Sequence, residues 1–234
     1  MAASAIWPAA SGAASQKPAQ SGNVKATRED WLDLALSVLA VEGVAHVTVL
    51  NLSERLGVSR SSFYWYFKNR DELLDALLDR WDSLNTRSIV AQAGEPAATV
   101  TEAVCSVFRC WVNPLIFSPR LDFAVREWAR RSARVRKALD RSDRLRTEAL
   151  KSLFVRFGYE DEDAFVRARV LYYMQIGYYA LDLKEPTEAR LKLAPRYLKA
   201  FTGVDPSAAE IGAFRAYAAR HANIPDFEPS RGRA

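Results

Sequence analysis

The sequence is poor in the residues that build metal centres, disulfide frameworks and catalytic triads. Among its 234 residues are 2 Cys and 2 His. Cys105 and Cys110 fall in one predicted helix, where a spacing of five residues turns them roughly 140° apart, so they cannot pair with each other. With only His46 and His221 as imidazoles, no zinc-ligand spacing exists. We therefore expect no metal site, no cofactor, and two buried, reduced thiols.

Long apolar runs and nucleotide or nucleophile motifs are also missing. No run reaches the about 18 residues that a membrane-spanning helix needs. The N-terminus lacks the continuous apolar stretch of a signal peptide, so we expect a cytoplasmic protein. The sequence has no Gly-x-Ser-x-Gly motif and no glycine-rich phosphate loop. Together with the scarce histidines, these absences argue against an enzyme.

Glycine and proline are scarce, at 10 residues each. Between them, apolar residues recur every three to four positions, as in amphipathic helices, and no convincing strand pattern appears. The hydrophobic fraction of 49% supplies ample material for a core. We therefore predict an all-α fold. The formal net charge of +5 suits a nucleic-acid partner, although many basic proteins of this size bind none.

One stretch in the first third of the chain has the spacing of a helix-turn-helix. Leu52 and Leu56 form an apolar stripe on a first short helix. Gly57 follows, where a helix C-terminus favours a residue that tolerates positive φ. Phe63 and Phe67, four residues apart, then point back at the first helix. In such a motif, the second helix enters the major groove of DNA.

If Phe63 and Phe67 face inward, other side chains of the second helix must face outward. Tyrosine and serine hydroxyls donate to phosphate oxygens, which sets docking register. Arg60 has the fork that matches a guanine edge, whereas Arg70, at a helix N-terminus, suits a phosphate. Tyr64, Trp65 and Tyr66 could each pack on neighbouring helices instead, but three in sequence cannot all face inward.

The segment LSERLGVSRSSFYWYFKNRDELL, preceded by the helix TREDWLDLALSVLAVEG, resembles the DNA-binding signature of the TetR family of transcriptional regulators. The resemblance is close over about residues 25–85 and loose beyond them. It implies that Tyr64, Thr48 and Arg70 contact phosphates. Ser61 stands where the family commonly has Gly or Pro, and Tyr66 where it has His. The expected DNA contacts are Thr48, Arg60, Ser61, Ser62, Tyr64, Trp65, Tyr66 and Arg70.

The resemblance also implies a ligand cavity and a dimer in the remainder of the chain. Aromatic residues abound there, and they could line a cavity for a mostly apolar molecule or simply form a solid core. We expect the cavity near Trp81, Phe108, Trp111, Trp128 and Tyr173. A run of arginines, from Arg126 to Arg136, could bind an anionic ligand group or form a solvated helix face. Reading two half-sites requires two-fold symmetry, and the apolar stripes of two late helices predict the interface: Tyr172, Ile176, Tyr179, Leu183, Leu191, Leu198 and Phe201.

The chain is thus expected to have four parts: a disordered extension at 1–24 that contains Trp7, a DNA-binding domain at 25–85 with its motif at 48–67, a helical ligand-binding and dimerisation domain at 86–222, and a loose tail at 223–234. The protein is expected to be a ligand-responsive transcriptional regulator. The leading expectation is a repressor, which a small, largely apolar effector releases from a palindromic operator. Its partners would be double-stranded DNA, the effector and a second copy of the chain. An activator of the same family and a low-specificity architectural DNA-binding protein are the alternatives.

Overall fold

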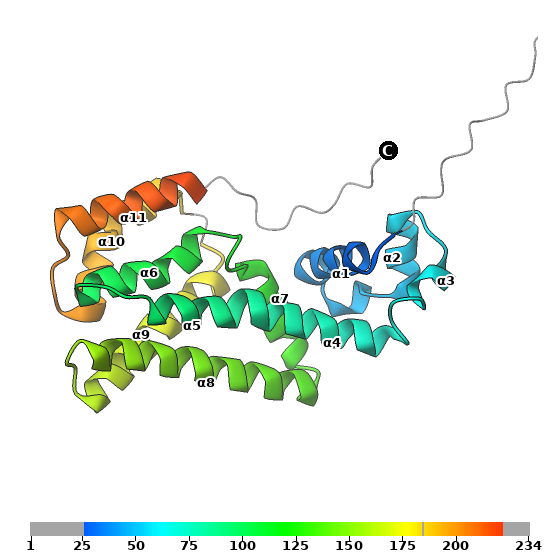
Figure 1. Ribbon diagram of the computed structural model, residues 1–234, viewed down its shortest axis with the longest axis horizontal. Helices are drawn as coiled ribbons and strands as arrows, with labels where there is room; N and C mark the ends of the chain where they lie inside the picture. The colour runs from blue at the N-terminus through cyan, green and yellow to red at the C-terminus, as the bar shows by residue number, and fades with distance from the viewer. Residues whose placement is uncertain (1–25, 184, 222–234) are drawn as a thin grey trace, which may run out of the picture.

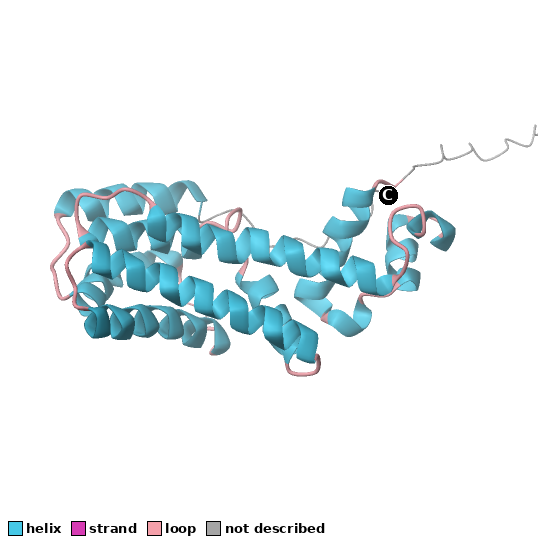
Figure 2. Cartoon of the chain, turned by 60° about the horizontal axis from the view of Figure 1, so that its bottom comes forward, coloured by secondary structure: helices cyan, strands magenta, loops and turns pink. Residues whose placement is uncertain are grey.

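The computed structural model describes residues 26–183 and 185–221. The predictions for the extension at 1–24, for Trp7 and for the tail at 223–234 therefore concern residues outside this description. Within the described residues every regular element is a helix, which confirms the all-α prediction (Figure 2). No helix in this part of the chain combines the length and apolarity needed to cross a membrane.

The helices fall into two groups at opposite ends of the molecule (Figure 1). We call the first group the head; it comprises α1 (Arg28–Glu42), the 3₁₀ turn η1 (Val44–His46), α2 (Val49–Leu56), α3 (Arg60–Phe63) and α4 (Arg70–Trp81). We call the second group the body; it comprises α5 (Arg87–Gly94), α6 (Val100–Val112), α7 (Pro119–Ala129), α8 (Ala133–Arg156), α9 (Asp161–Ala180), α10 (Thr187–Thr202) and α11 (Ala208–His221).

Local sequence signals set most helix ends. Thr27 caps α1 through a reciprocal pair of hydrogen bonds with Asp30, as its sequence position predicts. Pro119 occupies the first turn of α7, where its missing N–H costs nothing. Gly203 ends α10 in the left-handed conformation, at φ 77°. These short-range signals therefore set where the three helices begin or end.

A single long helical path joins the head to the body (Figure 1). The backbone continues from α4 through a π-helical turn, η2 (Asp82–Thr86), into α5. The N–H of Arg87 donates to the carbonyl of Asp82, five residues earlier, so this turn contains one residue more than a regular α-helix would. Before this turn Leu77 and Trp81 pack in the head core, and after it Ile89 packs in the body core.

Two apolar clusters form the core. The head cluster centres on Trp31, whose ring meets Phe63 at 5.2 Å between centroids, with Phe67 stacked beyond at 5.3 Å from Phe63. The head cluster also includes residues of α7 and the start of α8, such as Leu121 and Val135. It thus crosses the domain boundary that the sequence predicts between residues 85 and 86. The body cluster joins α5, α6, α9, α10 and α11 with the later part of α8. The start of the body thus packs with the head.

A buried polar cluster lies where the two apolar clusters meet. The Arg146 side chain is fully buried. Its Nη1 donates to Oδ1 of Asp122 at 2.9 Å, and its Nε and Nη2 donate to Oγ1 of Thr86 at 3.2 and 3.0 Å. The indole Nε1 of Trp81 donates to the same carboxylate oxygen at 2.9 Å. The end of α4, the π-turn, α7 and α8 therefore meet at one carboxylate.

Arg126 extends this cluster towards α9. Its guanidinium donates to Asp122 at 3.0 Å, to Asp143 at 2.8 Å and to the Tyr172 hydroxyl at 2.9 Å. That hydroxyl donates in turn to Asp143 at 2.6 Å. Buried charges need such partners, because an unpaired charge would carry a large desolvation penalty. Arg126 is thus a structural residue and not part of a solvated face.

Candidate DNA-binding surface and ligand cavity

The helix-turn-helix is built as its sequence predicts. The Thr48 hydroxyl accepts the N–H of Asn51 at 3.2 Å and so caps α2. Gly57 ends α2 at φ 68°, in the left-handed region that favours glycine. The N–H of Val58 then donates to the carbonyl of Ser53 at 3.1 Å, which closes the turn before α3. Ser53 is buried at the crossing, where a larger side chain would separate the helices.

The recognition segment, α3 with the turn that follows it, exposes two large aromatic rings. Phe63 is fully buried, whereas Tyr64 is 59% exposed and Trp65 is 66% exposed. Arg60 and Ser61 are exposed on the same short segment. Contiguous aromatic exposure on a folded domain marks a binding surface. These four exposed residues lie where the sequence placed them for DNA contact.

Two of the expected contact residues lie differently. Ser62 is only 8% exposed, and its hydroxyl donates to the carbonyl of Ser59 at 2.8 Å. Tyr66 is half-buried and packs against the head core. The position of each is set by the short α3, which turns every third or fourth residue back towards α2. Their side chains therefore stabilise the recognition segment, and DNA contact by Ser62 and Tyr66 stays a prediction.

Arg70 also has a role that the sequence did not predict. Its Nε donates to the carbonyl of Val47 at 2.6 Å and its Nη2 to the carbonyl of Val44 at 2.8 Å. These bonds attach the start of α4 to η1 and to the entry of α2. Arg70 therefore positions the motif, and much of its donor capacity is already used. Lys68, two residues earlier, is exposed and is a cation that sequence reasoning missed.

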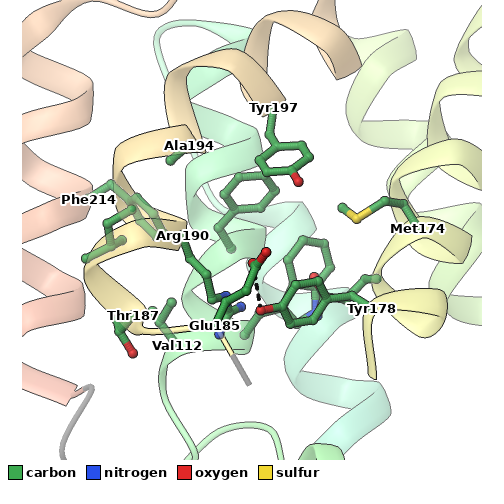
Figure 3. Close-up of a pocket in the computed structure, with 13 residues that line it drawn as sticks. Val112, Met174, Tyr178, Glu185, Thr187, Arg190, Ala194, Tyr197 and Phe214 are labelled. Atoms are coloured by element: carbon green, nitrogen blue, oxygen red, sulfur yellow. Dashed lines mark hydrogen bonds between the residues drawn. The ribbon is translucent and has the colours of Figure 1, made fainter. Parts of the chain in front are cut away.

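The body contains a small cavity between α6, α9, α10 and α11 (Figure 3). Its volume is about 70 Å³. The side chains that line it are mostly apolar or aromatic, with a few polar groups: Phe108, Trp111, Val112, Met174, Gln175, Tyr178, Glu185, Thr187, Arg190, Leu191, Ala194, Tyr197 and Phe214.

The expected ligand residues do not line one cavity. Phe108 and Trp111 do line the cavity in the body. Trp81 is buried at the polar cluster, with its indole bonded to Asp122. Tyr173 is 49% exposed on the outer side of α9, where Arg169 covers its ring. The tertiary arrangement separates these aromatics because they leave their helices in different directions, so the expected grouping is corrected.

Trp128, the fifth expected ligand residue, borders a larger groove between head and body. This groove has a volume of about 600 Å³. Its head side includes the segment 43–46, and its body side includes α7 and the end of α9, with Tyr178 and Tyr179. Tyr178 lines both the groove and the smaller cavity. The end of α9 thus lies between the smaller cavity and the head.

The residues expected at a dimer interface lie mostly inside one chain. Tyr172 is 3% exposed and belongs to the polar cluster, and Leu198 and Phe201 are buried in the body core. The half-buried ones pack against that core: Ile176, Tyr179 and Leu191. Only Leu183 is exposed. The interface assignment is therefore corrected for Tyr172, Leu198 and Phe201, whereas for the other four residues it stays a prediction.

The outer face of α9 carries an exposed apolar stripe instead. Val166, Val170 and Tyr173 recur at intervals of four and three residues, which places them on one side of the helix. Each has about half of its surface exposed, at 55%, 52% and 49%. Phe165 beside them and Leu193 on α10 are also 44% exposed. We call Phe165, Val166, Val170 and Tyr173 the α9 stripe.

Both cysteines are buried, as the sequence predicts. Burial raises the pKa of the Cys105 and Cys110 thiols to about 12. The thiols are therefore protonated at neutral pH and poorly nucleophilic. No group of three metal-binding side chains occurs among the described residues.

Comparison with known proteins matches the head. Residues 32–77 match the family model "Bacterial regulatory proteins, tetR family". The chain is 41% identical to tetracycline repressor protein class C of Escherichia coli over 61 residues, which are 26% of this chain and 28% of that protein. It is 34% identical to the transcriptional regulator TtgR of Pseudomonas putida over 79 residues, 34% of this chain and 37% of that one. The chain thus matches about a third of the length of these relatives.

The likeness in fold extends much further than the likeness in sequence. The crystal structure of Mycobacterium smegmatis AmtR is similar with a TM-score of 0.56 and 20% sequence identity, over 88% of this chain and 96% of that one. At this identity the comparison establishes a shared fold. The head thus carries a DNA-binding domain of the TetR family of bacterial regulatory proteins, and the chain as a whole shares the fold of this crystal structure.

Proposed function

We propose that the protein is a homodimeric, ligand-responsive repressor that a small, largely apolar effector releases from a palindromic operator. The observation that carries the proposal is the recognition segment, whose exposed Tyr64, Trp65 and Arg60 stand on a firmly capped helix-turn-helix. A continuous helical path connects this surface to a body that contains a cavity. The reading surface and the ligand site are thus mechanically joined.

On DNA, the recognition segment would lie in the major groove. Arg60 forms no ion pair or side-chain hydrogen bond with the residues the structure describes, so its guanidinium can fork onto a guanine edge. The hydroxyls of Thr48 and Tyr64 would donate to phosphates on either side. Lys68 would add a phosphate contact that Arg70, engaged with two carbonyls, supplies less readily.

Dimerisation would use the α9 stripe. A face of four half-exposed apolar side chains is costly in water and is typical of a subunit interface. Pairing α9 with its symmetry mate would bury this stripe and place two recognition segments on one side of DNA. Light scattering should then give twice the chain mass, and Val170→Glu should give the monomer. A wild-type monomer that binds a palindrome tightly would contradict the dimer.

The DNA proposal is tested by selecting bound fragments from a random pool and footprinting the winners. A palindromic consensus is expected. Arg60→Ala should then reduce discrimination at particular base pairs, by about 1–3 kcal/mol each. Arg144→Ala removes the same charge from an exposed position on α8 and serves as the control. If the Arg60 variant lost affinity equally for every sequence, the base-reading role would be wrong.

Repression and effector release form a separate step of the proposal. An effector that binds one arrangement of the heads more tightly than another changes the affinity of the protein for DNA. By linkage, DNA changes the affinity of the protein for the effector by the same factor. The expected result is release of the selected operator by metabolites linked to the neighbouring genes. An effector that strengthens DNA binding would instead indicate a co-repressor or an activator.

A further inference from the structure

The body cavity has an apolar wall and two unused hydrogen-bond donors. Its walls include the rings of Phe108, Trp111 and Phe214, all less than 10% exposed. Phe108 lies 5.1 Å from Trp111 and 5.8 Å from Phe214 between ring centroids. Such a wall favours a flat apolar ligand, because offset and edge contacts between rings are attractive. The wall alone does not define which polar group the ligand carries.

Gln175 supplies the first unused donor. The residue is 6% exposed and lines the cavity. Its amide nitrogen, Nε2, makes no hydrogen bond with any described residue. The Tyr179 hydroxyl lies one helical turn later. Burial raises the pKa of that hydroxyl and the amide lowers it by a smaller amount, but the contact between them lacks the geometry of a full hydrogen bond and leaves both groups unsatisfied. A buried donor without a partner costs free energy, and an acceptor on a ligand would remove that cost.

Arg190 supplies the second. Its side chain is half-buried, reaches towards Tyr178 in Figure 3, and lies 4.7 Å from the centroid of that ring. Among the residues the structure describes, its guanidinium makes no ion pair or hydrogen bond. By contrast, Arg126 and Arg146 are each paired with Asp122. Arg190 therefore retains the planar fork that fits a carboxylate.

Glu185 is the one acidic residue that lines the cavity. It is exposed, and it accepts a hydrogen bond from the Tyr178 hydroxyl at 3.2 Å. Figure 3 shows this bond as a dashed line. The Glu185 carboxylate thus already has a donor and faces solvent, whereas the donors of Arg190 and Gln175 await an acceptor. Because the groups that lack a hydrogen-bond partner are donors, the cavity favours an anionic ligand over a cationic one.

We infer that the effector is a small carboxylic acid with a flat apolar body, whose carboxylate binds Arg190 and Gln175 while its body packs on Phe108, Trp111 and Phe214. This inference rests on the proposed function and specifies the chemical class of its effector. The cavity of about 70 Å³ is small, so the ligand is of single-ring size unless flexible Met174 and the part-exposed Tyr197 move aside.

The position of the cavity gives such a ligand a route to the head. Tyr178 lines both the cavity and the groove that faces residues 43–46 of the head. A carboxylate on Arg190 would replace its contact with the Tyr178 ring. Tyr178 and the end of α9 would then shift against the segment whose carbonyls, at Val44 and Val47, are held by Arg70. Ligand binding would thereby be coupled to the placement of the helix-turn-helix.

The test uses three probes of matched size with the purified full chain: phenylacetate, phenylacetamide and phenethylamine. Calorimetry and the fluorescence of the lining Trp111 report binding. Phenylacetate should bind at least about tenfold more tightly than the amide or the amine, as expected for a charge-assisted pair. Tighter binding of phenethylamine would assign recognition to Glu185 and overturn the inference, and so would equal binding, or no binding, of all three.

Variants then assign the donors. Arg190→Met should weaken phenylacetate binding about tenfold or more, and Arg190→Lys should restore part of it, because a lysine keeps the charge without the fork. Gln175→Met should weaken binding severalfold, whereas Glu185→Gln should not weaken it. Arg196→Met, at an exposed position of the same helix, is the matched control. Unchanged phenylacetate affinity in a folded Arg190→Met protein would overturn the inference.

The operator measurement separates this inference from the proposed function. DNA binding by the unliganded wild-type protein tests the regulator alone. If no DNA is selected but phenylacetate binds through Arg190, the proposed function fails and the ligand class stands. If a palindrome is selected but the carboxylate shows no preference, the ligand class fails and the regulator stands.

Discussion

The head packs around aromatic rings, whereas the head–body boundary is built on buried charge. In the head, the buried polar side chains among the described residues are small serines, Ser37, Ser53 and Ser62. At the boundary, Arg146 and Asp122 are both almost completely buried and bonded to each other. Apolar packing tolerates substitutions that keep volume, but a charge cluster depends on every partner. Substitutions that keep volume should therefore be tolerated in the head, whereas loss of any one partner should disrupt the charge cluster at the boundary.

The largest expected effect comes from breaking the polar cluster. Arg146→Met should lower the free energy of unfolding by about 3–5 kcal/mol, because it leaves the Asp122 carboxylate partly unpaired in the core. Urea unfolding followed by circular dichroism measures it. Arg144→Met, exposed on the same helix, should change stability by less than about 0.5 kcal/mol. Equal effects of the two substitutions would show that the boundary does not depend on its buried charge cluster.

The boundary should also be more sensitive to acid than the head. Burial alone would raise the pKa of the Asp122 carboxyl, but Arg146 and Arg126 outweigh burial and hold this pKa at about 2. Because the pKa in the unfolded chain is about 3.9, the stabilisation is fully present above that pH and is lost as pH falls towards 2. Its size is on the order of 2 kcal/mol.

Unfolding by urea between pH 2 and pH 5 checks this prediction. Asp122→Asn should lose the part of the pH dependence that arises from this carboxyl, although it will be less stable throughout. If the wild type and the Asp122→Asn variant gave parallel curves across this range, the boundary would owe its acid sensitivity to other groups.

A smaller effect should follow from changing the turn of the head. Gly57→Ala should cost about 1–2 kcal/mol, because an alanine at φ 68° is strained. A Cβ at Gly57 would meet no neighbour, so backbone conformation is the sole cause. Gly94→Ala, at a helical residue with equally open surroundings, should stabilise slightly. Thermal unfolding of both variants compares them, and similar shifts would contradict the turn assignment.

The smallest effect concerns the surface of the head. Tyr64→Phe removes one hydroxyl from an exposed ring, so it should lower DNA affinity about two- to tenfold. Because the assigned partner is a phosphate, the loss should be the same for the selected operator and for random DNA. Titrations against both sequences measure it. A loss confined to the operator would assign Tyr64 to base contact instead.

The sequence predicted the head better than the body because local signals dominate there. Caps at Thr27 and Thr48 and the left-handed Gly57 act within a few residues, and all were recognisable. The roles of Ser62 and Arg70 were not, because each depends on the direction in which its side chain leaves a helix. A short helix of four residues gives almost no periodic pattern from which that direction can be read.

The body shows why helix positions alone do not define a site. Arg146 sits in a basic segment that reads as solvent-facing, yet it is completely buried because Asp122 arrives from α7. Tyr172 and Tyr173 are neighbours in sequence, but one is buried in the polar cluster and the other is exposed. To predict which of the two is buried, one must know how each helix is rotated about its axis. Contacts between residues distant in sequence determine that rotation. The all-α fold needed no such information.

The π-helical turn between α4 and α5 has a consequence for hybrid proteins. Its extra residue turns everything that follows by about 100° relative to a regular helix, so Ile89, which would otherwise lie about 80° from Trp81 around the helix, lies within about 20° of it and packs in the body core. The family match ends at residue 77, just before this turn. A head from another family member grafted at that point should work only if the residue count of 82–86 is kept. Loss of one residue would send the apolar face of α5 into solvent, whatever sequence the new head carried.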